Sequence, residues 1–415
     1  MSFGNFSSYQ RRVLTLLMLI NFVNYVDRQM IFPLFPFLRR DFGLTFFQSG
    51  LLATSFTIVL SIVSLPLGML ADRTSRRAVI AGGVLFWSAA TFFSGLVRSF
   101  RGLLAARALV GVGEAAYTPA GAAIISAAFP KTMRARVQGV FDIGMFVGGA
   151  VGMALGGIMG QWFGWRPAFF IVGFPGLLLG LSVFKLREPR RVTPDALFPI
   201  VELLRVPAYV MVLVAGWFSA FAGYTYIVWG PELVQTYKGF SASESGVVLG
   251  LTSILSGMCG VLVGATVSDK LSQVMLGGRT IVIPIGFIIA APLIYFAIES
   301  HSKMGFVVLF GLGAFFMSWY HGPVTATIHD LISPQGHATA LGLYSLFVNL
   351  FSMAVAPPLV GRLADRYGLP SALHAAIAAQ LVGGILFVVV VWLARRHHAM
   401  AAQVADQTEE SAAAS

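Results

Sequence analysis

The stretch NYVDRQM, residues 24–30, places an aspartate next to an arginine between the apolar runs VLTLLMLINFV and IFPLFPFL. An ionisable side chain costs at least about 2.5–3.5 kcal/mol at the centre of a membrane span, so such residues face a protein interior and need partners. Neighbouring residues of a helix point about 100° apart, which makes Asp27 and Arg28 poor partners for each other. We therefore expect each of them to pair with a charge on another helix.

The stretch RALVGVGEA, residues 107–115, supplies the complementary charges. Arg107 and Glu114 are seven residues apart, so they share one face of a helix and lie about 10 Å apart along its axis. We expect Arg28 to pair with Glu114, and Asp27 to pair with Arg107. Two carboxylates and two guanidinium groups at one place can exchange partners when one carboxylate takes up a proton.

The composition indicates the class of protein that holds these charges. Hydrophobic residues make up 57% of the 415 residues and charged residues 11%, against about 45–50% and about 25% in soluble domains. The mean hydropathy is +0.81. One membrane crossing takes about 20 apolar residues, so the chain has room for about a dozen. We predict an all-α polytopic membrane protein. The single cysteine excludes an internal disulfide framework.

The apolar runs form two sets of six, separated by a polar and basic stretch. They fall at about 12–38, 47–71, 78–97, 102–129, 135–160 and 165–185, and at about 209–232, 243–268, 280–298, 304–329, 338–361 and 371–394. We predict twelve transmembrane helices in two pseudo-symmetric six-helix bundles. The bundles are residues 1–185 and 209–394, the cytoplasmic linker between them is 186–208, and a disordered cytoplasmic tail is 395–415.

The basic residues are scattered through the short loops, so the net charge of +11 indicates membrane topology rather than a nucleic-acid partner. Lys and Arg are more frequent in the loops that lie inside when both termini are cytoplasmic. We therefore expect a multi-pass protein of a bacterial inner membrane with both termini in the cytoplasm, and we expect it to be a monomer.

Three motifs resemble those of the major facilitator superfamily. GMLADRTSRR, residues 68–77, resembles its loop motif after the second span, with Ser75 where a glycine is usual. RALVGVGEA resembles its fourth-span motif. The fifth span carries a glycine at every fourth position, and such spacing predicts a very close helix contact; the glycines are Gly144, Gly148, Gly152, Gly156 and Gly160.

Within the superfamily, NYVDRQM and RALVGVGEAAYTPAG resemble the spinster family, whose members are associated with proton-coupled export of lysophospholipids and sphingosine phosphates. The resemblance implies a secondary active transporter that works by alternating access. The first half carries charges within its spans, whereas the second half carries almost none and many Phe, Leu and Val residues. This asymmetry suits an amphipathic anionic substrate such as a lysophospholipid.

We accordingly assign Asp27 and Glu114 to proton coupling, with Asp27 as the first candidate. Substrate binding or switching is assigned to Arg28, Arg107, Tyr25, Tyr117 and His321. The alternative interpretation is a static tetrad of Asp27, Arg28, Arg107 and Glu114 that only fixes helix packing.

The resemblance also implies an inner gate. Asp72 is expected near the start of the eleventh span, around Gly336–Ala340, because a carboxylate interacts favourably with a helix N-terminus. The gate residues assigned on this basis and from their loop positions are Asp72, Arg73, Arg76, Arg77, Asp142 and Asp269. In the second half, SWYHGP, residues 318–323, predicts a kink with packed aromatic side chains, and GPE, residues 230–232, predicts a break that shapes an outer gate.

Rival functions have weaker support in the sequence. It has no HExxH, no G-x-S-x-G and no phosphate-binding Gly-Lys-Ser loop, so we expect neither an enzyme nor a cofactor or metal. A proton-coupled symporter of a small organic anion, a monocarboxylate or a sugar acid, is the alternative, because an Asn-Tyr-x-Asp-Arg stretch also occurs in organic-anion symporters of the superfamily.

Asp72→Asn is expected to shift the conformational population toward the inward-open state, because the gate contact of Asp72 forms only while the cytoplasmic side is closed. The measurement is the reaction rate of a cysteine placed near Gly336 with a reagent supplied from the cytoplasmic side, which should rise. Unchanged labelling would show that Asp72 has no gate function.

Overall fold

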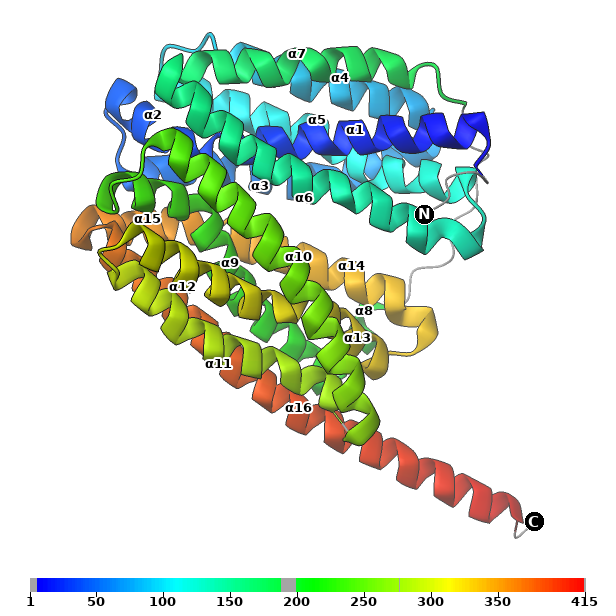
Figure 1. Cartoon of the computed structure of the whole chain (residues 1–415). Helices are drawn as coiled ribbons and strands as arrows, with labels where there is room; N and C mark the ends of the chain where they lie inside the picture. The colour runs from blue at the N-terminus through cyan, green and yellow to red at the C-terminus, as the bar shows by residue number, and fades with distance from the viewer. Residues whose placement is uncertain (1–5, 188–198, 276, 414–415) are drawn as a thin grey trace. The chain divides into compact units, whose positions relative to one another are not determined.

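The computed structural model describes residues 6–187, 199–275 and 277–413, and this part of the chain is built of helices (Figure 1). Ten helical stretches in it are long and apolar enough to cross a membrane. Together with α1 (Ser8–Met30) and α5 (Phe100–Ala128), which carry the charged residues of interest, they match the twelve predicted spans. The predicted fold class, an all-α polytopic membrane protein, is confirmed.

The remaining helices of the first half follow the predicted spans closely. They are α2 (Phe35–Phe42), α3 (Phe46–Arg73), α4 (Arg76–Ser94), α6 (Lys131–Trp162) and α7 (Trp165–Val183). The first apolar run, predicted at about 12–38, is not one continuous helix. The helix instead ends at Met30 and continues through a 3₁₀ turn, Phe32–Leu34, into α2. Proline lacks the backbone N–H that continues a helix, and this segment contains Pro33 and Pro36.

The second half contains two interrupted spans. Its helices are α8 (Ile200–Leu204), α9 (Pro207–Tyr237), α10 (Ala242–Val274), α11 (Gly278–Glu299), α12 (Lys303–Met317), α13 (His321–Leu331), α14 (His337–Val348), α15 (Ala356–Tyr367) and α16 (Leu369–Ala413). A 3₁₀ turn, Ser318–Tyr320, separates α12 from α13, and a π-helical segment, Asn349–Met353, follows α14.

The 3₁₀ turn before α13 interrupts the α-helix at the place where SWYHGP predicted a kink. Pro323 has no N–H to donate to the carbonyl of Trp319, so the regular hydrogen-bond pattern fails there. The predicted aromatic packing is also present. The ring of Tyr320 stacks on Phe287 with 5.9 Å between centroids, and the ring of Trp319 lies 5.2 Å from that of Phe316.

The chain divides into two compact units that do not coincide with its two halves. Unit 1 is Met1–Pro194, Thr225–Ile254 and Met353–Ala372, and unit 2 is Asp195–Tyr224, Leu255–Ser352 and Leu373–Ser415. Unit 1 therefore includes the end of α9, the start of α10 and α15. The predicted bundle boundaries and linker stay predictions, since residues 188–198 of the linker lie outside the described part. Helix α16 extends to Ala413 through the predicted tail, whose Ala, Gln and Glu residues are good helix formers.

The glycines of α6 bring its backbone against α1, as the spacing predicted. A Cβ atom added at Gly144 would lie 2.8 Å from the carbonyl oxygen of Met18, and one at Gly152 would lie 2.6 Å from that of Val26. Cβ atoms at Gly148 and Gly156 would likewise meet main-chain atoms of α1. Because this contact runs along α1, it fixes the position of the helix that carries Asp27 and Arg28.

Gly152→Ala is expected to destabilise the protein by about 1–3 kcal/mol, because the added methyl group forces α1 and α6 apart. The measurement is thermal unfolding in detergent. Gly139→Ala is the matched control on the same helix, since no atom lies within 4 Å of a Cβ added there. A Gly152→Ala protein as stable as the Gly139→Ala protein would contradict the close contact.

Candidate functional site

Arg28 and Glu114 form the first of two ion pairs that join α1 to α5. Arg28 Nη2 lies 2.6 Å from Glu114 Oε2, and Arg28 Nε donates a hydrogen bond of 2.7 Å to the same oxygen. The Glu114 side chain is fully buried, whereas 24% of the Arg28 side chain is exposed. The pairing predicted from the sequence is confirmed.

Asp27 and Arg107 form the second pair. Arg107 Nη1 lies 2.9 Å from Asp27 Oδ1, and the exposed fractions of the two side chains are 2% and 1%. Thr91 of α4 donates a hydrogen bond of 2.7 Å from its hydroxyl to Asp27 Oδ2. The predicted pair is confirmed, and Thr91 is a third participant that the sequence did not indicate. A threonine in a span usually bonds to its own helix, so only the position of α4 identifies this one.

The two pairs differ in how completely their polar atoms are bonded. Both oxygens of Asp27 accept a hydrogen bond, and the pair lies out of contact with solvent. Glu114 Oε1 is buried and accepts no hydrogen bond of good geometry among the described residues, although the side chain of Asn24 interacts with this carboxylate. An oxygen without a well-formed hydrogen bond can take up a proton without losing a strong bond. The Arg28–Glu114 pair is therefore the more readily changed of the two.

Two aromatic rings support the guanidinium of Arg28. Its central carbon lies 5.0 Å from the ring centroid of Tyr25 and 4.8 Å from that of Phe56. Cation–π attraction of this kind stabilises a guanidinium where its charge is not fully neutralised by an acid. Tyr25 therefore lies beside the charged site, and the substrate-binding or switching role assigned to it stays a prediction.

Two other residues assigned to substrate binding lie elsewhere in the fold. Tyr117 is buried, donates a hydrogen bond of 2.9 Å to the carbonyl of Leu17, and packs edge-on against Trp87. These contacts are those of a core residue of unit 1. His321 begins α13 in unit 2 and is exposed, with its ring 5.3 Å from that of Tyr320. The roles assigned to both residues stay predictions.

The residues assigned to the inner gate are divided between the two units. Arg77 Nη1 donates a hydrogen bond of 3.1 Å to the carbonyl of Leu186, and Asp142 accepts one of 3.0 Å from Gln138. Asp269 is exposed on α10 in unit 2. Arg73 ends α3 and Arg76 begins α4. The side chain of Asp72 lies outside the described residues, so the gate assignment stays a prediction.

A third ion pair, which was not predicted from the sequence, joins α2 to α9. Arg39 Nη1 bonds to Glu232 Oε1, and Glu232 is buried. The guanidinium of Arg39 also lies 3.5 Å from the ring centroid of Phe46. Helix α9 continues through Pro231, so the break predicted from GPE is absent. The signal in the sequence was the glutamate itself, an isolated acid within an apolar span.

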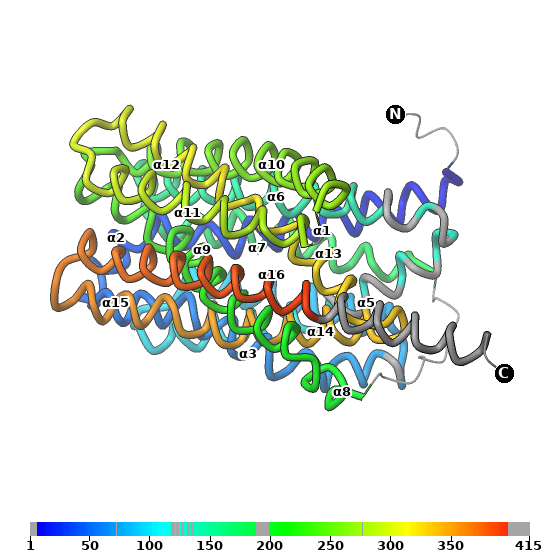
Figure 2. The backbone as a smooth tube through the Cα atoms, turned by 90° about the horizontal axis from the view of Figure 1, so that it is seen from below, coloured from blue at the N-terminus to red at the C-terminus, as the bar shows by residue number. Residues whose placement is uncertain are grey.

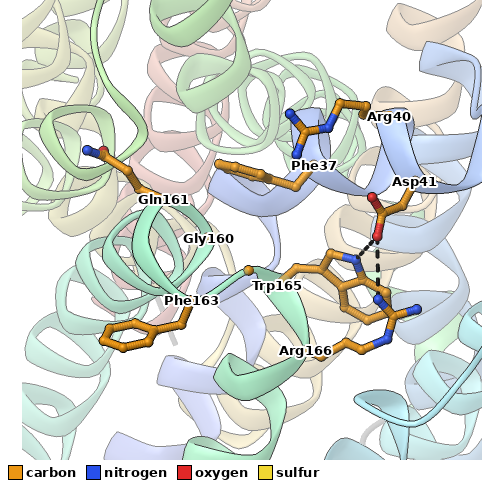
Figure 3. A pocket seen from close by; sticks show the side chains of 9 residues that line it. Phe37, Arg40, Asp41, Gly160, Gln161, Phe163, Trp165 and Arg166 are labelled. Carbon is orange, nitrogen blue, oxygen red and sulfur yellow. Dashed lines mark hydrogen bonds and ion pairs between the residues drawn. The ribbon is translucent and has the colours of Figure 1, made fainter.

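An open surface pocket lies at the same end of unit 1 (Figure 3). It is lined by residues of α2 and by those at the junction of α6 and α7, including Phe37, Arg40 and Gln161. Trp165 donates a hydrogen bond of 2.8 Å from its indole nitrogen to Asp41 Oδ2, and Arg166 lies 3.4 Å from the same oxygen. The pocket contains none of the predicted site residues.

Long apolar helices with two ion pairs between two of them, one pair completely buried, are typical of membrane transport proteins. The chain belongs to the Major Facilitator Superfamily, whose family model matches residues 17–298 and 267–413. It is therefore an integral, multi-pass secondary transporter and not an enzyme.

Comparison with known proteins supports the predicted resemblance to spinster proteins. An MFS-type efflux pump of Mycolicibacterium smegmatis is 29% identical over 91% of this chain and 91% of its own length. Protein spinster of Drosophila melanogaster is 26% identical over 85% of this chain and 61% of its own length. A hexuronate transporter of Bacillus subtilis is 27% identical over 88% of this chain and 90% of its own length.

A solved structure shares the fold. The crystal structure of a bacterial homolog to the human lysosomal transporter Spinster matches 94% of this chain and 98% of that chain, with a TM-score of 0.83 and 24% identity.

Arg107→Ala is expected to cost about 3–5 kcal/mol, because it leaves the buried carboxylate of Asp27 without its cation. The double variant Arg107→Ala/Asp27→Asn removes that charge and should recover much of the loss, as measured by thermal unfolding in detergent. Arg166→Ala, which breaks an exposed pair, should cost no more than about 1 kcal/mol. A double variant as unstable as Arg107→Ala alone would contradict the pairing.

Proposed function

We propose that this transporter couples proton movement to transport of an amphipathic anion such as a lysophospholipid, through exchange of partners at Arg28. The observation that carries the proposal is the asymmetry of the first ion pair. Arg28 is partly exposed, while its partner Glu114 is buried and keeps one oxygen without a well-formed hydrogen bond. Arg28 can therefore receive an anion from the exposed side, and Glu114 can receive the proton.

Charge balance explains why the two ligands would bind together. The four residues of the site, two acids and two guanidinium groups, sum to zero charge. An anionic head group that binds Arg28 in place of Glu114 would leave Glu114 as a buried, unpaired carboxylate, which costs several kcal/mol. A proton on Glu114 removes that cost, so protonation favours anion binding and the anion favours protonation. This reciprocity is the thermodynamic basis of coupled transport.

Asp27 is the second proton-coupling residue in this proposal. The sequence favoured it as the first candidate, but both of its oxygens are bonded here and Arg107 holds it away from solvent. We infer that Glu114 takes up the proton in this conformation. Asp27 would follow only in a conformation where the contact with Arg107 or Thr91 changes.

The substrate class rests on two observations. The chain is similar over most of its length to a spinster protein, and the spans of its second half are apolar in sequence, which suits a hydrocarbon chain. The alternative substrate is a small organic anion, which the similarity to a hexuronate transporter favours. Both substrates present an anionic group to Arg28, so the charge mechanism is the same for either.

The remaining parts of the proposal concern the setting of the protein. We propose that it works as a monomer in a bacterial inner membrane, with both termini in the cytoplasm, and that its partners are the lipid bilayer, its substrate and protons. No nucleic acid takes part.

Glu114→Gln is expected to abolish the pH dependence of transport, because glutamine resembles the protonated acid and cannot release a proton. The measurement is substrate movement into proteoliposomes at several external pH values. Asp27→Asn tests the second carboxylate in the same assay, and Arg166→Ala is the control that should behave as the wild type. A Glu114→Gln protein with the wild-type pH profile would assign the proton site to Asp27 or another acid.

Arg28→Ala is expected to weaken substrate binding by about 10- to 100-fold, because it removes a charge-assisted hydrogen bond. Binding of a lysophospholipid and of glucuronate to the purified protein, measured by calorimetry, separates the two substrate classes. Saturable binding of glucuronate without binding of the lysophospholipid would replace the lipid proposal with the alternative. Equal affinity of Arg28→Ala and wild type for the bound ligand would exclude Arg28 as its site.

A further inference from the structure

The first turn of α3 contains backbone N–H groups that its own residues do not bond. The first N–H groups of a helix have no partner within the helix. Here a capping box satisfies two of them, because Thr45 accepts a hydrogen bond from the N–H of Gln48 and Gln48 accepts one from the N–H of Thr45. The N–H groups of Phe46 and Phe47 are left for another segment.

Asp365, in the last turn of α15, supplies both missing bonds. Its Oδ1 accepts a hydrogen bond of 2.7 Å from Phe46 N–H, and its Oδ2 accepts one of 3.0 Å from Phe47 N–H. The contact spans more than 300 positions in the sequence, yet all of these residues belong to unit 1. A carboxylate also interacts favourably with the positive end of the helix dipole at this place.

Glycines let α15 approach α3 closely enough for this contact. A Cβ atom added at Gly361 would lie 2.6 Å from the carbonyl oxygen of Phe46, and one at Gly50 would lie 2.5 Å from that of Pro357. Position 46 therefore faces 361 and position 50 faces 357, so the two helices run antiparallel. The two helices lie against each other in the trace of the backbone (Figure 2).

The residues that make this contact repeat a motif found at the other end of α3. GRLADR, residues 361–366, and GMLADR, residues 68–73, share the pattern Gly-x-Leu-Ala-Asp-Arg. In both copies the aspartate follows the glycine by four residues, so the two lie on one face of a helix, one turn apart. The first copy contains Asp72 and ends α3, and the second contains Asp365 and ends α15.

We propose that Asp365 is a latch residue, whose contact with α3 holds this end of the transporter closed. The helix α3 and the span formed by α14 and α15 each carry one copy of this latch, Asp72 on α3 and Asp365 on α15, and the two copies act at opposite ends of the transporter. The Asp365 copy is engaged in this structure. The Asp72 copy, expected from the family resemblance to cap the start of the eleventh span, would engage when the opposite end closes. Asp365 meets the N-terminus of α3, and by the antiparallel relation of α3 and α15 the Asp72 copy would meet the N-terminus of the span of α14 and α15.

Two further contacts in unit 1 join other helices of the first half of the chain to helices of the second half, so Asp365 is one of several bonds that must open. Glu232 of α9 pairs with Arg39 of α2. The start of α10 crosses α6 at glycines, since a Cβ atom added at Gly250 would lie 2.7 Å from the carbonyl oxygen of Ala150. Loss of Asp365 alone should therefore shift the conformational balance without unfolding the protein.

The test measures how often this end opens. Ser49 is buried on α3 next to Gly50, so Ser49→Cys in a Cys259→Ser background reports opening through its reaction with a maleimide in nanodiscs. Asp365→Asn should raise the labelling rate roughly two- to fivefold, the size of a helix-dipole contact at a surface. Asp365→Lys should raise it further, because a cation is repelled by the helix N-terminus.

Matched controls separate a latch from general loosening. Ser94→Cys, equally buried on α4, should label at the wild-type rate in every variant. Asp41→Asn changes an acid at the same end whose carboxylate is bonded to two α7 side chains, Trp165 and Arg166, and should leave Ser49→Cys labelling unchanged.

Variants of Asp72, the latch residue at the opposite end, provide the decisive comparison of labelling rates. Asp72→Asn should lower the labelling of Ser49→Cys, and the double variant Asp72→Asn/Asp365→Asn should return it toward the wild-type rate. A structural role for Asp365 would instead raise labelling at Ser94→Cys as well. An unchanged rate in Asp365→Asn and Asp365→Lys would overturn the proposal. The assay contains no substrate and is run at one pH, so its outcome is independent of the proposed substrate and proton coupling.

Discussion

The burial of three charged side chains, and the partial burial of a fourth, is the constraint on which the rest of this structure depends. Asp27, Arg107 and Glu114 are almost completely buried, and each of them must meet an opposite charge at hydrogen-bond distance. Removing either partner leaves a charge that the surrounding helices cannot solvate. The positions of α1 and α5 are therefore set by these pairs, and any event that changes one pair must change the balance between conformations.

Glycine backbones supply the close helix contacts that such positioning needs. Helix α6 meets α1 at Gly144 and Gly152, and α15 meets α3 at Gly361. In lipid, helices gain little from burying apolar side chains against one another, so close backbone packing and polar contacts decide which helices associate. Close contacts at glycines therefore fix the position of α1, which carries the charged site, and let α15 approach the N-terminus of α3.

The charged site and the Asp365 contact belong to one compact unit, which links them mechanically. Helix α1 continues through the 3₁₀ turn at Phe32–Leu34 into α2, and α2 carries Arg39, the partner of Glu232 on α9. A change of partner at Arg28 would act on α1, the helix whose continuation, α2, makes the contact with Glu232. In the proposed mechanism, protonation and substrate binding shift the equilibrium between two arrangements of these contacts. Coupling between two distant sites requires such an element, whose equilibrium both sites affect.

The sequence by itself determined the number and order of the spans and the partners of the four charges. Apolar runs of the length of a membrane crossing are visible without a structure, and the 100° step of the helix excluded a pair between Asp27 and Arg28. It did not reveal Thr91 beside Asp27, Arg39 beside Glu232, or Asp365 at the start of α3. It also missed the end of α1 at Met30. These features depend on which helices lie side by side, because Thr91, Glu232 and Asp365 gain their partners only when distant segments meet. The local sequence limits which secondary structure a segment can form, and the tertiary packing decides which of its polar groups form hydrogen bonds or ion pairs with one another.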